Sequence, residues 1–158
     1  MSPWPGCGDQ LLVELKRAPG RLALVADDPH GQVTTAFAGR LGVPLHRAGA
    51  GLLDSSPPTH PDQVVDRLAA AGPVVADLDL LFWKPWLALD PLGVLRAVSR
   101  RRPGTLFDWP GTISGDRATY SAPGRRDFFE ATLTDAVVLR PQPTNFPDEP
   151  PYRIERFA

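Results

Sequence analysis

Residues 21–41 carry the sequence RLALVADDPHGQVTTAFAGRL, which decides the fold class. Residues 21–26 form a nearly continuous apolar run, as a strand buried on both faces of a sheet requires. A turn with two aspartates, a proline and a glycine follows, and apolar side chains then recur at helical spacing from residue 32 to residue 41. The order of strand, tight turn and helix predicts the start of a βαβ unit.

The same alternation continues along the chain. Further segments of strand character occupy residues 43–48, 74–81, 105–109, 117–121, 135–139 and 152–157. Helices are predicted at residues 10–17 with Asp9 as N-cap, at residues 62–71, and from Pro91 onward with Asp90 as N-cap. Alternating strands and helices indicate a parallel sheet with helices on both faces. We therefore expect a single three-layer α/β domain over residues 1–158, with a mainly parallel sheet of about five strands, a loose start at residues 1–8 and a proline-rich tail at residues 141–151.

The composition excludes several classes of protein. The chain has 158 residues, of which 42% are hydrophobic, enough for one sizeable core and too many for a disordered chain. No apolar run approaches the roughly 18 residues of a membrane span. The start of the chain lacks the pattern of a secretory signal, and the single cysteine, Cys7, excludes an internal disulfide framework. We therefore expect a cytoplasmic protein with no membrane partner.

The turn after the first strong strand lies where a phosphate-binding loop would lie. Such a loop follows the pattern G-x-x-x-x-G-K-[ST], in which the backbone cradles phosphate, the lysine reaches it and the hydroxyl binds magnesium. Residues 26–33 occupy this window, and only the second glycine is kept. The positions that would contact a nucleotide are Ala26, Asp28, Gly31, Gln32, Val33 and Thr34.

The residues that bind phosphate and magnesium in such a loop are largely absent from this window. Gln32 stands in the place of the lysine, Val33 stands in the place of the Ser or Thr, and Thr34 comes one residue late. Asp27 and Asp28 add negative charge where an anion would dock. The expected cofactor is therefore none, or weakly bound ATP with magnesium.

Carboxylates follow several of the predicted strands. Asp77 and Asp79 lie near the end of the strand at residues 74–81 and are the candidate metal ligands, since a carboxylate there commonly holds magnesium. Together with Asp27, Asp28 and Asp108 they could converge on one divalent cation, because strand ends of a parallel sheet meet at one edge. That arrangement predicts a metal-dependent phosphotransfer or nuclease domain. The alternative is that these aspartates cap turns and helices.

A basic block forms the middle of the chain. Residues 91–126 hold seven arginines against two aspartates, a net charge of +5, although the whole chain carries −1. Partner docking is predicted for the arginines of the helix after residue 90 and for the two tryptophans before it, namely Trp83, Trp86, Arg96, Arg100, Arg101 and Arg102. Two alternatives remain open for the arginines: a nucleic-acid contact, or simple complementation of the negative end of a helix.

The order of motifs in residues 74–128 resembles a known family. An acidic apolar strand ends in DLLF at residues 79–82, LDPL follows at residues 89–92, WPG at residues 109–111 and ATYSAPG at residues 118–124. This segment, about a third of the chain, resembles the small P-loop protein of type 3 bacteriophage-exclusion (BREX) systems, the BrxF family. The resemblance implies a RecA-like P-loop NTPase fold and a place in an antiviral defence complex, whose other components would be the partners and could bring the chain near DNA.

The chain departs from that family at both nucleotide motifs. Family members would carry an intact phosphate loop and an Asp-x-x-Glu pair on the later strand. Here Gln32 and Val33 break the loop, Asp79 takes the place of the Glu, and Ala76 takes the place of the first Asp. ATP hydrolysis is therefore not expected. The resemblance and the departures together predict a non-hydrolysing accessory subunit of a BREX-like complex that acts by protein docking.

Overall fold

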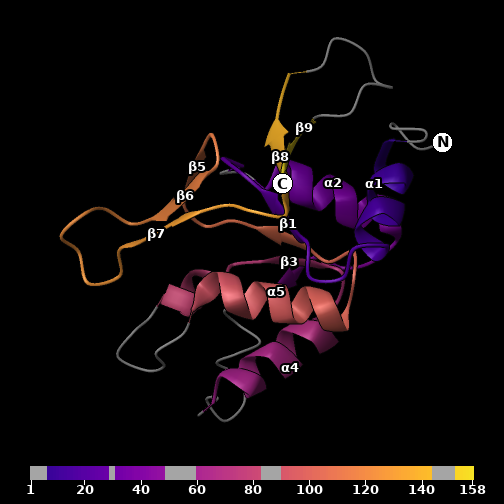
Figure 1. Cartoon of the computed structure of the whole chain (residues 1–158). Coiled ribbons are helices and arrows are strands. Elements are labelled where there is room, and N and C mark those ends of the chain that lie inside the picture. Colours follow the sequence, from indigo (N-terminus) through magenta and orange to yellow (C-terminus); the bar gives the residue numbers. More distant parts are fainter. Residues whose placement is uncertain (1–6, 29–30, 49–59, 83–89, 144–151) are drawn as a thin grey trace.

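A six-stranded sheet forms the middle layer of the structure (Figure 1). The computed structural model describes residues 7–28, 31–48, 60–82, 90–143 and 152–158. The strands lie in the order β2-β3-β4-β1-β8-β9. Their bounds are β1 Leu22–Val25, β2 His46–Arg47, β3 Val74–Ala76, β4 Leu106–Asp108, β8 Ala136–Pro141 and β9 Tyr152–Phe157. All neighbours are parallel except β8 and β9, which are antiparallel. The mainly parallel α/β sheet is thus confirmed, with six strands against the expected five or so.

Helices cover both faces of this sheet, as expected. Their bounds are α1 Cys7–Lys16, α2 Gln32–Leu41, α4 Pro61–Ala71 and α5 Pro91–Arg101, with a short 3-10 helix η1 at Asp79–Phe82. The fully buried strand β1 shows the two sides: Ala23 and Val25 share a core with α1 and α2, whereas Leu22 and Leu24 share a core with α4 and α5. Figure 1 shows the two helix pairs on opposite sides of the strands.

A second, antiparallel sheet is inserted between β4 and β8. It contains β5 Thr112–Ser114, β6 Arg117–Tyr120 and β7 Phe129–Thr132. Of these strands, β6 matches the strand predicted at residues 117–121, whereas β5 and β7 were not predicted. Both are short: β5 has one buried residue between two exposed ones, and β7 alternates partly buried and exposed positions. Neither therefore carries the apolar run that marks a buried strand.

Aromatic side chains attach the second sheet to the first. The ring of Tyr120 stacks on Phe82 with centroids 3.9 Å apart, and Trp109 packs edge-on against Phe82 at 5.5 Å. Phe129 of β7 completes the cluster. The indole N–H of Trp109 also donates a hydrogen bond to the carbonyl oxygen of Thr119 at 3.0 Å. These contacts fix the small sheet beside the carboxyl end of β4.

The helix boundaries follow the predicted signals in part. Asp90 is the N-cap residue of α5 and Pro91 is in its first turn, as predicted, and Gly42 ends α2 with a positive φ of 68°. Helix α1 begins at Cys7, before the predicted cap at Asp9. No helix in the described part of the chain combines the length and the apolar character that crossing a membrane requires.

Candidate functional site

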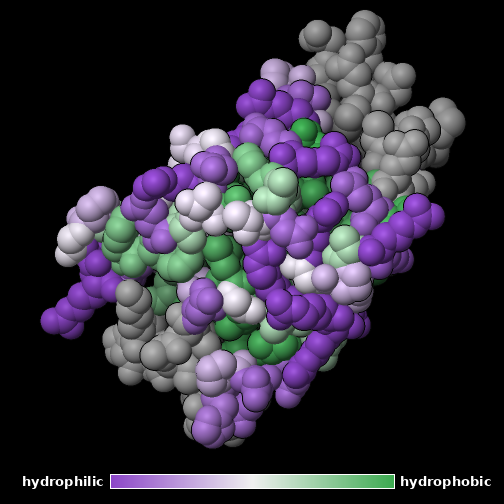
Figure 2. Space-filling view, viewed as in Figure 1, coloured by the Kyte–Doolittle hydropathy of each residue, from purple (hydrophilic) through white to green (hydrophobic). Residues whose placement is uncertain are grey.

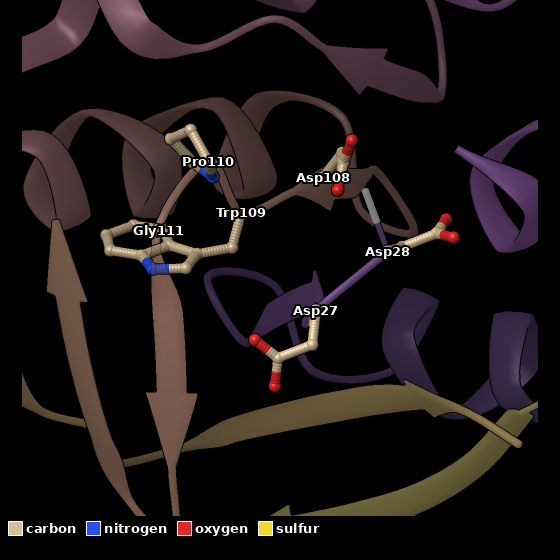
Figure 3. A pocket seen from close by; sticks show the side chains of 6 residues that line it. All are labelled: Asp27, Asp28, Asp108, Trp109, Pro110 and Gly111. Atoms are coloured by element: carbon tan, nitrogen blue, oxygen red, sulfur yellow. The ribbon is translucent and has the colours of Figure 1, made fainter. Parts of the chain in front are cut away.

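A groove opens at the carboxyl ends of β1 and β4 (Figure 3). The two strands are hydrogen-bonded neighbours with Val25 opposite Asp108, so the residues that follow them meet. The groove has a volume of about 450 Å³ and is lined by Asp27, Asp28, Asp108, Trp109, Pro110 and Gly111. Ligands of open α/β sheets bind at this end of the strands. The structure therefore places the predicted phosphate-loop turn at the edge of a real groove, with Asp108 and Trp109 as its other wall.

The carboxylate of Asp28 caps helix α2. Its Oδ1 accepts a hydrogen bond from the backbone N–H of Gln32 at 2.9 Å. Its Oδ2 accepts hydrogen bonds from the N–H groups of Val33 at 2.9 Å and Thr34 at 3.3 Å. The residue is only 8% exposed. These are the N–H groups that a helix N-terminus would offer to an anion, and here a carboxylate of the chain itself accepts them.

The geometry of the turn explains why Asp28 reaches the helix. Asp27 has a φ of 53° and Gly31 has a φ of 65°, both in the left-handed region. Aspartate tolerates this region better than most residues, and glycine adopts it freely. The turn thus bends back on itself, and the carbonyl of Asp28 accepts the N–H of Gly31 at 3.0 Å. The hydroxyl of Thr34 donates to the carbonyl of Gly31 at 3.1 Å. Of the other predicted nucleotide contacts, Ala26 and Val33 are fully buried.

Among the residues that line the groove, Asp108 has a strongly raised pKa. Burial, reinforced by the negative charges of Asp28 and Asp79, raises the pKa of Asp108 from 3.8 to about 7, and Arg47 acts in the opposite direction. The side chain therefore carries a proton for a large part of the time at neutral pH. In Figure 3 the carboxylates of Asp27, Asp28 and Asp108 point in different directions rather than toward one centre.

The two predicted metal ligands occupy different surroundings. Asp77 is exposed and has a φ of 61°, in the same left-handed region as Asp27 after β1. Asp79 opens η1, and its Oδ1 accepts a hydrogen bond from the hydroxyl of Tyr120 at 2.9 Å. Burial and this hydrogen bond raise the pKa of Tyr120 to about 12, so the tyrosine remains a donor. Within the residues that the structure describes, no three His, Cys, Asp or Glu side chains are grouped closely enough to hold a metal ion.

Arg140, at the end of β8, is a site residue that the sequence analysis missed. Its side chain is 13% exposed and donates to the carbonyl of Ile113 at 2.6 Å and to Glu155 at 2.6 Å. It also contacts Asp27 Oδ2 at 3.4 Å. Arg140 therefore connects the groove, the small sheet and β9. The available signal was an arginine directly after the strand predicted at residues 135–139. The sequence does not show its partners, which come from three separate parts of the chain.

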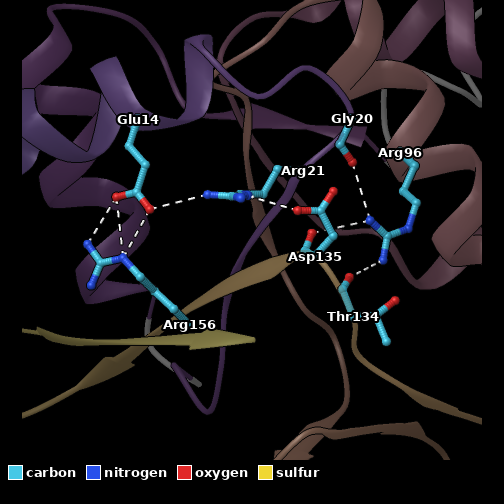
Figure 4. Close-up of polar contacts among 7 residues, drawn as sticks. All are labelled: Glu14, Gly20, Arg21, Arg96, Thr134, Asp135 and Arg156. Atoms are coloured by element: carbon cyan, nitrogen blue, oxygen red, sulfur yellow. Dashed lines mark hydrogen bonds and ion pairs between the residues drawn. The ribbon is translucent and has the colours of Figure 1, made fainter. Parts of the chain in front are cut away.

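The arginines predicted for docking differ in their contacts within the chain, and Figure 4 shows those of Arg96. The guanidinium of Arg96 donates to three carbonyls, those of Gly20, Thr134 and Asp135. Arg101 forms an ion pair with Asp66 of α4.

The other residues predicted for docking form fewer contacts within the chain or fall outside the residues that the structure describes. Arg100 lies against Gly20, and Arg102 is the half-buried C-cap residue of α5, whose carbonyl accepts the hydroxyl of Thr105 at 2.6 Å. Trp83 and Trp86 fall outside the described residues. The outer surface of α5 is thus left to Arg100 and Arg101, both exposed.

The raised pKa of Asp108 predicts a specific pH dependence of stability. The unfolded chain loses this proton near pH 3.8 and the folded chain near pH 7, so between these values the folded state holds the extra proton. Stability contributed by this group therefore falls as the pH rises from about 4 to about 7, and is constant above that range. Asp108→Asn removes the titration. We expect the variant to gain at least about 1 kcal/mol over the wild type between pH 4 and pH 8.

Urea unfolding of both proteins across that pH range measures this gain. The exposed Asp116→Asn serves as the matched control and should change the stability difference much less. A constant difference between Asp108→Asn and the wild type at all pH values would contradict the prediction.

Comparison of the chain with protein-family models, with curated proteins and with solved structures gives no match.

Proposed function

We propose that the chain is a degenerate P-loop-like domain that does not turn over ATP and acts as a docking subunit of a larger assembly. The observation that carries this proposal is the Asp28 carboxylate on the N–H groups of Gln32, Val33 and Thr34. A nucleotide phosphate bound in the manner of a phosphate loop needs those same donors. The assembly we propose is the BREX-like defence complex to which the motifs of residues 74–128 point.

The charge of the groove supports the first half of the proposal. A phosphate entering it would have to displace Asp28 and would then face the neighbouring carboxylate of Asp27. A like charge at about 4 Å opposes binding by roughly 1 kcal/mol in water, and by more where water is excluded. Neither Gln32 nor Val33 supplies a compensating charge or hydroxyl. Repulsion and competition for the N–H donors therefore act together against ATP.

Engineered variants separate these two effects. In the background Gln32→Lys with Val33→Thr, adding Asp28→Gly removes one charge and frees the N–H donors, whereas adding Asp27→Gly removes one charge and leaves those donors bonded to Asp28. We expect titration calorimetry with Mg-ATP to show at least about tenfold tighter binding for the first triple variant, a difference of about 1.4 kcal/mol. Circular dichroism verifies that each variant is folded.

The wild type provides the decisive measurement for turnover. We expect phosphate release with Mg-ATP to stay at background over hours. Turnover by the wild type that Asp79→Ala abolishes would overturn the proposal. Equal affinities of the two triple variants would show that charge alone, and not occupation of the helix N-terminus, keeps ATP out.

The second half of the proposal concerns the docking surface. Helix α5 presents Arg100 and Arg101 to solvent. Hydrophilic groups cover most of the side of the molecule seen in Figure 2, and hydrophobic groups gather near its middle. Among the described residues, Val13 of α1 is the large hydrophobic residue that is exposed, and it lies on another helix. An acidic partner surface therefore fits the exposed surface of α5 better than an apolar one. Arginine is also enriched among residues that dominate binding energies at interfaces.

Two substitutions at one ion pair test the docking role. Both Arg101→Glu and Asp66→Ala break the contact between α4 and α5, but only Arg101→Glu reverses the charge of the exposed surface. We expect Arg101→Glu, but not Asp66→Ala, to reduce co-purification with the neighbouring operon products. Unchanged recovery of every partner with folded Arg101→Glu would leave α5 without a docking role. Salt-sensitive binding of duplex DNA by the wild type would instead favour a nucleic-acid function.

A further inference from the structure

We draw no further inference here: the strongest candidate, the groove that Asp27, Asp28 and Asp108 line at the carboxyl ends of β1 and β4, belongs to the site already described, and nothing in the described part of the chain besides these acidic residues shows which ligand would occupy it.

Discussion

Replacement of Gly111 by alanine is expected to lower the free energy of unfolding by about 3 kcal/mol or more. A Cβ atom at this position would lie 1.8 Å from the carbonyl oxygen of Thr119 and 2.9 Å from the Cα of Tyr120. Both atoms belong to the backbone of β6, so no side-chain rotation relieves the clash. The same Thr119 oxygen accepts the indole N–H of Trp109, so separation of the strands also breaks this hydrogen bond. Urea unfolding measures the loss.

Gly39 provides the matched control for this substitution. It lies within α2, and a Cβ atom there would meet no atom within 4 Å. Gly39→Ala should raise the stability by about 0.5–1 kcal/mol, because alanine favours the helix more than glycine does. If Gly111→Ala were as mild as Gly39→Ala, the close approach of the groove wall to β6 would be wrong.

Replacement of Asp28 by alanine is expected to cost about 2–3 kcal/mol of stability. Three N–H groups at the start of α2 lose their acceptor, and those of Val33 and Thr34 are buried. A buried donor without a partner costs more than the hydrogen bond itself contributes. Hydrogen exchange at the Val33 and Thr34 amides should accelerate together with the loss of stability. Asp28→Asn keeps one acceptor oxygen and should lose less.

The neighbouring Asp27 controls for the loss of charge. Asp27→Asn keeps a residue that tolerates the left-handed conformation and removes an exposed contact with Arg140. Exposed pairs of this kind contribute little, so we expect a change of about 0.5 kcal/mol or less. Equal losses in Asp28→Ala and Asp27→Asn would show that the cap is not what holds the turn against α2.

The fold class follows from patterns that lie within a few residues of one another. The run that becomes β1 is apolar at every position, because a strand in the middle of a covered sheet buries both faces. Asp90 before Pro91 predicted the start of α5, and the helical spacing of residues 32–41 predicted the extent of α2, which ends at the glycine that follows, Gly42. The small sheet lacked such a pattern: β5 and β7 become strands mainly through pairing with β6 and contact with the cluster around Phe82.

The candidate site also has features that the sequence could predict and features that depend on tertiary contacts. The sequence alone predicted that the turn after β1 takes the position of a phosphate loop. It also showed that the lysine and hydroxyl of that pattern are missing and that aspartates follow several predicted strands. Only the tertiary structure decided that Asp28 turns onto α2 and that burial raises the pKa of Asp108 to about 7. It also decided that Arg96 is hydrogen-bonded to carbonyls 38, 39 and 76 residues away. Residue type and spacing specify which groups a chain can offer. Which partner each group meets depends on strand register and helix packing, which bring distant segments together.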